Sequence, residues 1–168
     1  MRVLIKKIVI VVFAFYLTAC GFHLRGALDL PSGFKSVYLD GGSDMLRDEF
    51  KRVMETSSVQ LADSPEHAGL IVHIFNEDNR RQILSLSSGG AANEFELDYN
   101  VQFEVLDSHS KVLLPRESMD VKRDYFNNQQ AIIAKDNEEM TIRGEMYQQA
   151  VRGIVSRIRV VLESSNVK

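Results

Sequence analysis

Residues 94–105 read EFELDYNVQFEV, and the architecture of the chain can be worked out from them. From Phe95 to Val105 every second residue is apolar, and the residues between them are polar or acidic. Since successive side chains of a β-strand point to opposite faces of a sheet, the pattern predicts a long strand with one apolar and one polar face. The apolar face requires a second layer of structure to cover it.

Further strands are predicted on both sides of this segment. Residues 107–110 (DSHS) indicate a hairpin turn, and residues 112–126 indicate the strand that returns from it. Upstream, residues 70–75 (LIVHIF) are nearly all apolar, which is typical of a strand buried on both faces. The sequence leaves open whether Leu70 to Leu86 forms one interrupted strand or two. Residues 34–39 indicate a first strand.

Two amphipathic helices are predicted to form the covering layer. Ser43 or Asp44 can cap the first helix, whose apolar residues follow at i, i+4, i+7 and i+8. They are Leu46, Phe50, Val53 and Met54. The second helix runs to about Ser164, and Asp136 with Glu139 resembles a capping box at its start. Its apolar stripe consists of Ile142, Met146, Ala150, Val151, Ile154, Val155, Ile158 and Leu162. The order strand, helix, strands, helix predicts one α+β domain of two layers with a mixed sheet.

The first residues of the chain predict export. Arg2, Lys6 and Lys7 precede residues 8–17, which are uncharged and almost entirely apolar. A positive segment followed by an apolar segment of this length is typical of a secretory signal peptide. A membrane-spanning helix needs about 20 apolar residues, so a transmembrane anchor is the weaker interpretation.

Residues 17–20 (LTAC) resemble the bacterial lipobox, in which a signal peptidase cleaves before a lipidated cysteine. The resemblance implies a signal peptide over residues 1–19, lipid attachment at Cys20 and a mature chain of residues 20–168. The alternative is a free thiol that behaves as a small buried apolar group. Gly21 stands where Asp would favour retention at the inner membrane, so the expected location is the outer membrane, on its periplasmic side.

Charge and motifs restrict the function. The mature chain would carry 17 Lys and Arg against 23 Asp and Glu, because three basic residues leave with the signal peptide. An exported, acidic protein is not expected to bind nucleic acid. The four histidines lack metal-ligand spacing and no catalytic motif is found, so neither a metal nor a cofactor is predicted and the chain is expected not to be an enzyme. The alternative is a lipid-anchored periplasmic hydrolase that uses the strand carboxylates Glu94, Glu96 and Asp98.

Residues 20–26 (CGFHLRG) look like the start of mature members of the lipopolysaccharide-assembly lipoprotein family LptE, also called RlpB. Further segments are similar to that family in the same order, and the set covers essentially the whole chain. These segments are residues 93–105, 113–115, 123–126, 134–139 and 145–147. Each segment is short, but the ordered set together with the lipobox is specific.

The resemblance implies a lipoprotein of the outer membrane that plugs the LptD β-barrel and helps to assemble it. It also implies that the protein helps lipopolysaccharide reach the cell surface without catalysing a reaction. The implied fold is two helices packed on a mixed, mostly antiparallel four-stranded sheet. A structural lipoprotein that binds another envelope partner is the remaining alternative.

The resemblance also carries candidate residues for contact with lipopolysaccharide. Lys135 matches a family lysine implicated in that contact, and a lysine beside a helix N-terminus suits a phosphate group. The neighbouring acidic residues leave a solvated lysine as the alternative. The family's second basic contact has no counterpart here, because residues 84–93 contain no Lys or Arg. Arg80 and Arg81, which lie just upstream, are the expected substitutes.

Overall fold

A computed structural model describes residues 35–57, 59–127 and 132–165. The alternating segment lies within the strand β4 (Ala92–Asp107), near the middle of the sheet. The six apolar residues from Phe95 to Val105 are all buried, and the polar residues between them are half-buried on the opposite face. The strand and its two unlike faces are therefore as predicted.

The sheet contains five strands in the order β2–β1–β3–β4–β5. Strand β1 (Ser36–Asp40) runs parallel to both β2 (Gln60–Leu61) and β3 (Leu70–Leu86). Strand β4 is antiparallel to both β3 and β5 (Val112–Phe126). The expectation of four mostly antiparallel strands is not exact, because it lacked β2 and the second parallel pairing. Strand β2 has only two residues, both exposed, which is too short for a hydrophobic alternation to reveal.

Residues Leu70 to Leu86 form one strand of 17 residues, which answers the question that the sequence left open. Its pairing with β4 shifts register between Ile74 and Asn76, where a β-bulge interrupts the ladder. Before the bulge Leu70, Val72 and Ile74 are buried, whereas beyond it the strand is largely exposed. Because β1 pairs only with residues 70–73, the sheet has three strands beyond the bulge.

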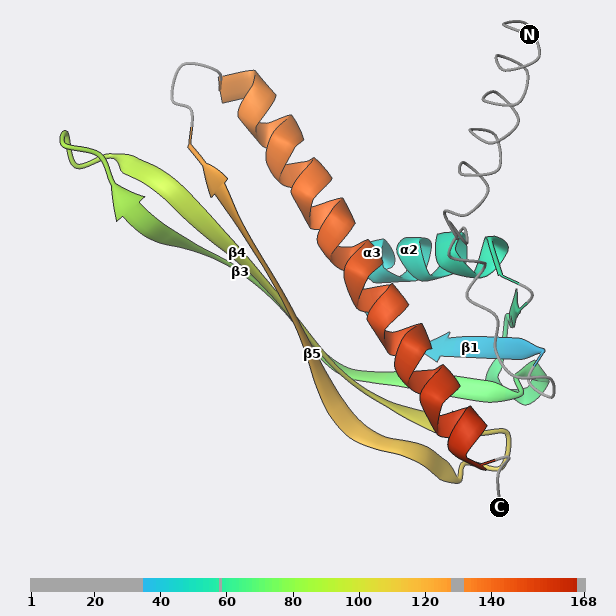
Figure 1. Cartoon of the computed structure of the whole chain (residues 1–168). Coiled ribbons are helices and arrows are strands. Elements are labelled where there is room, and N and C mark those ends of the chain that lie inside the picture. Colours follow the sequence, from blue (N-terminus) through green and yellow to red (C-terminus); the bar gives the residue numbers. More distant parts are fainter. Residues whose placement is uncertain (1–34, 58, 128–131, 166–168) are drawn as a thin grey trace, which may run out of the picture.

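Helices α2 (Asp44–Glu55) and α3 (Ile132–Ser165) lie on the same face of the sheet (Figure 1). Ser43 caps α2, since its Oγ accepts a hydrogen bond of 3.2 Å from the backbone N–H of Leu46. The predicted apolar stripes face the core in both helices, and only Ile142 among their members is less than fully buried. No helix in the described ranges combines the length and the apolar character that crossing a membrane requires.

Helix α3 begins at Ile132, four residues before the predicted cap at Asp136. The prediction was wrong because Ile132, Ile133, Ala134 and Lys135 contain neither a cap residue nor a helix breaker, so the helix extends upstream through them. The second member of the supposed capping box, Glu139, uses its carboxylate to bind other side chains instead.

Figure 1 shows the resulting shape. Helix α2 and strand β1 lie at one end, and the β3–β4 hairpin extends from there towards the opposite end, with α3 along one side. We call the part of the sheet beyond the bulge, residues 76–86, 92–102 and 118–126, the distal arm. The candidate site residues of the described part lie on this arm or on the helix beside it.

Candidate functional site on the distal arm

The bulge determines which way the side chains of the distal arm point. Beyond it, Arg81 lies opposite Leu97, a buried residue on the helix side of β4. Arg80 lies opposite Asp98, on the outer face that no described helix covers. Directly opposed residues of an antiparallel pair share a face, so the two neighbouring arginines point to opposite sides of the sheet. Arg80 and Arg81 therefore cannot approach one ligand group together.

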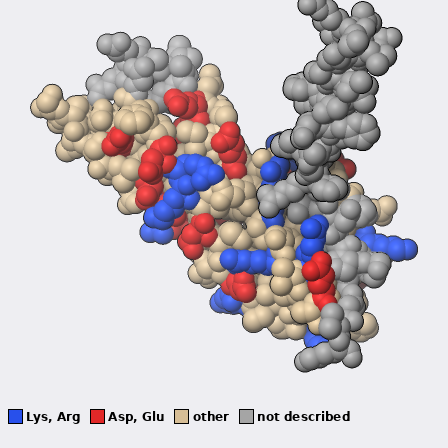
Figure 2. All heavy atoms as spheres, in the orientation of Figure 1, with Lys and Arg blue, Asp and Glu red and all other residues tan. Residues whose placement is uncertain are grey.

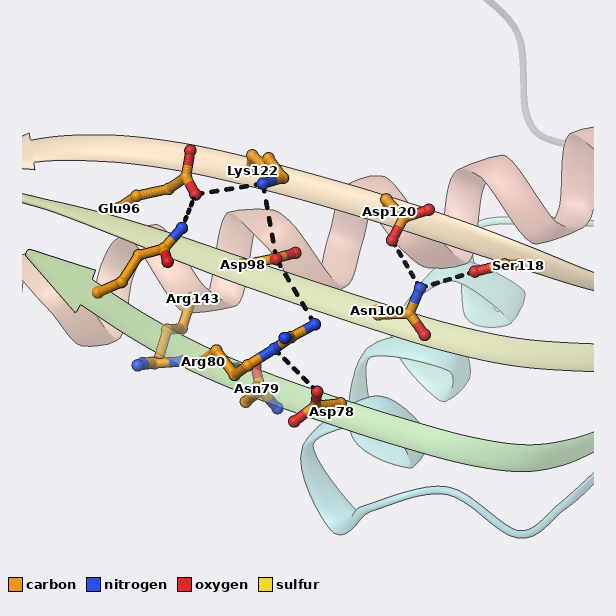
Figure 3. Close-up of polar contacts among 11 residues, drawn as sticks. Asp78, Asn79, Arg80, Glu96, Asp98, Asn100, Ser118, Asp120, Lys122 and Arg143 are labelled. Atoms are coloured by element: carbon orange, nitrogen blue, oxygen red, sulfur yellow. Dashed lines mark hydrogen bonds and ion pairs between the residues drawn. The ribbon is translucent and has the colours of Figure 1, made fainter. Parts of the chain in front are cut away.

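On the outer face, basic side chains lie between carboxylates (Figure 3). The Arg80 Nε atom is 3.0 Å from Asp78 Oδ2, and its Nη2 atom is 3.8 Å from Asp98 Oδ2. The Lys122 Nζ atom lies 3.2 Å from Glu96 Oε1 and 3.6 Å from Asp98 Oδ2. Arg80 is thus held by two carboxylates, and the cluster of these five groups has one more negative than positive charge.

The pairing changes how these outer groups ionise. Hydrogen bonds from Gln82 and Lys122 lower the pKa of Glu96. The hydrogen bond to Glu96 and the charge of Asp98 raise the pKa of Lys122. Glu96 and Lys122 therefore both remain charged near neutral pH. Figure 2 shows the same mixing on the side of the molecule that it presents, where acidic and basic side chains alternate over the arm.

The carboxylates considered for catalysis belong to this surface. Glu94 accepts a hydrogen bond of 2.6 Å from Ser85 Oγ, and further along the face Asn100 Nδ2 donates to Ser118 Oγ and to Asp120 Oδ1, each at 2.6 Å. Groups of three or more His, Cys, Asp or Glu side chains that could hold a metal ion are not found among the described residues. The outer face is thus a polar, mostly acidic surface on which Arg80 and Lys122 are paired with carboxylates.

On the helix side, Glu139 of α3 accepts hydrogen bonds from three side chains. Tyr125 Oη donates to Oε2 at 2.6 Å, and Arg81 Nη1 donates to the same oxygen at 3.0 Å. Arg143 donates to Oε1 through Nε at 2.9 Å and through Nη2 at 2.8 Å. These contacts join β3, β5 and α3 at one carboxylate.

The ionisation of this cluster follows from its contacts. Partial burial favours the neutral form of Glu139, but hydrogen bonds from Tyr125, Arg143 and Arg81 outweigh it and lower its pKa to about 2. Burial, together with the Glu139 carboxylate, raises the pKa of Tyr125 to about 12. Two arginines against one carboxylate leave the cluster with a net positive charge at neutral pH.

A second set of contacts fastens α3 to β3. Asn79 Nδ2 donates to Tyr147 Oη at 2.8 Å, and Arg143 Nη1 donates to Asn79 Oδ1 at 3.4 Å. The Tyr147 ring packs on the buried ring of Tyr99, with 4.6 Å between their centroids. The polar residues 76–79 predict a turn or bulge, which the register shift after Ile74 confirms. Sequence reasoning nevertheless missed both sets of contacts, because it did not predict that the bulge reverses which residues of β3 face the helix.

The remaining candidates are placed only in part. Lys135 lies in the first turn of α3, one turn before Glu139, and its side chain is outside the described part of the chain. Cys20 also lies outside the described residues. By backbone position, Lys135 and Arg81 are brought to the same end of the molecule, since Arg81 bonds to Glu139. Arg80 lies on the other face.

Two helices on one face of a long mixed sheet, with a polar and mostly acidic opposite face, define a two-layer α+β domain that presents a broad polar surface. Comparison with known proteins identifies this domain further. The chain belongs to the LptE lipopolysaccharide-assembly family, whose model matches residues 34–158.

Relatives support the same assignment. The chain is 27% identical over 157 residues to the LPS-assembly lipoprotein LptE of Pectobacterium atrosepticum, covering 89% of this chain and 82% of the relative. It is 26% identical over 145 residues to the protein of the same name from Yersinia enterocolitica, covering 84% and 69%. Among solved structures, lipoprotein B of Nitrosomonas europaea is similar with a TM-score of 0.65 and 28% identity, covering 83% of this chain and 90% of that one. The rare lipoprotein B of Shewanella oneidensis shares the fold, with a TM-score of 0.57, 23% identity and coverage of 79% and 96%.

Proposed function

We propose that this chain is a lipoprotein of the outer membrane that plugs a β-barrel of the LptD type and helps it deliver lipopolysaccharide to the cell surface. The observation that carries the proposal is the length of the sheet in a member of this family. At about 3.3 Å per residue, the 17 residues of β3 span about 50 Å or slightly more. A bilayer with its headgroups is about 40–45 Å thick, so the domain is long enough to extend through the height of a membrane barrel.

The outer face of the sheet suits the interior of such a barrel. Barrel lumens are polar, and an isolated charge that enters a confined space loses hydration. Arg80 and Lys122 have carboxylate partners, whereas Glu94, Asp120 and Asp124 leave the same face with excess negative charge. A face of this kind fits a polar wall that offers basic groups or water to these carboxylates.

Anchoring follows from the start of the chain. We propose that residues 1–19 are removed as a signal peptide and that Cys20 carries the lipid, which holds residues 20–168 on the periplasmic side of the outer membrane. Stable anchoring needs more than one acyl chain, at about 0.8 kcal/mol per buried CH₂ group.

Contact with lipopolysaccharide is proposed for the helix side of the distal arm. Arg81 and Arg143 together exceed the charge of Glu139, and Lys135 lies one helical turn away along the backbone. Phosphate groups pair with such basic groups, and Asp136 and Glu138 beside Lys135 offset part of their charge. Arg80 is a weaker candidate, because a phosphate would have to displace Asp78 and Asp98 from its guanidinium.

Binding of purified lipopolysaccharide to the full chain tests this assignment. Lys135→Asp is expected to weaken binding, whereas Lys111→Asp, on the exposed β4–β5 turn, is expected to leave it unchanged. Depletion of the protein from its native cells is expected to reduce lipopolysaccharide at the surface. Normal surface lipopolysaccharide after depletion would contradict the proposed function.

A further inference from the structure

Beyond the bulge, one edge of β3 is open. Strand β1 pairs only with Leu70 to His73, whereas β4 pairs with the other edge of β3 as far as Leu86. Within the described ranges, no other strand lies beside this part of β3. Because alternate residues of a strand turn their N–H and C=O groups towards opposite edges, the open edge offers backbone donors and acceptors to a further strand.

This edge lacks the residues that commonly keep a strand edge from pairing. Pro115 lies in β5, the long strand at the other side of the sheet, whereas residues 75–86 contain neither proline nor glycine. The ladder with β4 is regular from Asn76 to Ile83, and its register shifts on both sides of that run. The run is therefore a regular template of limited length.

The sequence of this run is complementary to itself in antiparallel orientation. Residues 76–82 read NEDNRRQ, with two acidic residues before Asn79 and two basic residues after it. If two copies pair about a two-fold axis at Asn79, every acidic residue of one copy lies opposite a basic residue of the other. Opposite charges in directly opposed positions stabilise a pair of strands. The opposed residues are Asn76 with Gln82, Glu77 with Arg81, and Asp78 with Arg80.

The side chains have the faces and the exposure that this pairing requires. Asp78 and Arg80 both lie on the outer side of β3 (Figure 3), and Glu77 and Arg81 both lie opposite buried residues of β4, on the helix side. The Arg80 side chain is 65% exposed, that of Asp78 45% and that of Arg81 47%. The Glu77 carboxylate is held in place by two hydrogen bonds of 2.7 Å from Ser43.

Charge favours this edge over the outer face as a contact between two copies. The two acidic and two basic residues of the run cancel. Glu94, Asp120 and Asp124 instead leave the outer face with excess negative charge, so two copies would repel each other face to face. A second copy of this chain thus fits the edge in charge as well as in backbone geometry.

We propose that two copies of this chain associate along the open edges of β3, antiparallel to each other and about a two-fold axis at Asn79. A contact of this symmetry pairs the edges of both copies at once. The regular run is short, so the dimer is expected to be weak and reversible, with a dissociation constant on the order of 10 µM. The inference goes beyond the proposed function and concerns chains outside a barrel, because it does not depend on a barrel partner.

Reversal of one charge in the outer pair tests the contact. Sedimentation equilibrium of the full chain, purified from membranes in a neutral detergent, measures dimerisation between about 1 and 100 µM. The parent chain is expected to dimerise. Arg80→Asp and Asp78→Arg each place like charges opposite one another, and each should raise the dissociation constant at least about tenfold. Lys111→Asp, the matched control on the exposed β4–β5 turn, should leave it unchanged.

Two combinations make the test specific for this geometry. The double variant Asp78→Arg/Arg80→Asp exchanges the charges within one chain and is expected to dimerise like the parent chain, because opposite charges again face each other. An equal mixture of the Asp78→Arg chain and the Arg80→Asp chain is expected to form mixed dimers, although neither chain does so alone. Far-ultraviolet circular dichroism should be the same for every variant, since both side chains are exposed and a lost dimer must not come from unfolding.

The possible results separate a second copy from other occupants of the edge. A parent chain that stays monomeric over the whole concentration range would overturn the inference and leave the edge to a strand of another protein. A dimer that Arg80→Asp does not weaken, or that the double variant does not restore, would show that the two copies meet at another surface and would also overturn it.

Discussion

Replacing Glu139 with glutamine removes the charge at which Arg81, Arg143 and Tyr125 meet, and the structure sets the size of the expected effect. Lowering a carboxyl pKa from 4.5 to about 2 corresponds to about 3 kcal/mol, at 1.36 kcal/mol per pKa unit. The side chain is 18% exposed, and water screens part of this interaction. We therefore expect Glu139→Gln to reduce the free energy of unfolding by about 2 kcal/mol at pH 7.

The same change has a defined pH dependence. Between pH 2 and about 4.5 the unfolded chain binds a proton at Glu139 that the folded chain does not, so this contribution to stability rises with pH across that window. It is complete above pH 4.5 and is lost as the pH falls through 2. The Glu139→Gln variant should therefore lose less stability than the parent chain on acidification from pH 5 to pH 3.

Urea unfolding followed by circular dichroism, at pH 7, 5 and 3, measures both effects. Glu138→Gln is the matched control, because Glu138 is the adjacent residue of α3 and is exposed. Its effect at pH 7 should stay within about 0.5 kcal/mol. If Glu139→Gln were as stable as the parent chain at pH 7 and kept its full acid sensitivity, the role assigned to this carboxylate would be refuted.

Three further outcomes are expected. Gly41→Ala should lower the free energy of unfolding by about 2 kcal/mol, because Gly41 has a φ of +87° and an added Cβ would lie 2.8 Å from the Ile74 carbonyl oxygen. The control Gly144→Ala, in open space on α3, should be neutral or stabilising. Equal losses of stability in the two variants would contradict this reasoning. Arg81→Ala should lower the free energy of unfolding in urea by about 1 kcal/mol, because the hydrogen bond to Glu139 is lost. Arg80→Ala, on the exposed outer face, should lower it by less than about 0.5 kcal/mol. The reverse order would show that the two faces are wrongly assigned. Cys20→Ser should abolish the lipid-dependent mass increase of the mature chain, and an unchanged mass would exclude Cys20 as the attachment point.

The parts of the fold that follow from regular patterns could be predicted from the sequence. The alternation from Phe95 to Val105 fixed the two faces of β4, and the stripes that begin at Leu46 and Ile142 placed both helices on the apolar face. Patterns of period 2 or 3.6 reveal such elements because residues at that spacing lie on the same face of a strand or helix and share its environment. Strand β2 has too few residues to show a period, and so the fifth strand was missed.

The site could be predicted only in part, because it depends on one irregularity. The bulge after Ile74 lies in a run without glycine or proline, and it moves Arg81 to the helix side and Arg80 to the outer side. The partner of Arg81, Glu139, is 58 residues away in the sequence, and its local context suggested only a helix cap. Contacts made across such distances depend on the register of the sheet, which a single sequence does not specify at this point.

In the function we propose, the outer face of the distal arm lies against the wall of an outer-membrane barrel. A photo-crosslinking amino acid placed at Asp120, an exposed residue halfway along that face, tests it most directly in native cells. We expect a covalent adduct with a β-barrel of the LptD type, identified by mass spectrometry. An adduct with a different envelope protein in its place, or none while the protein is present at its normal level, would contradict the claim.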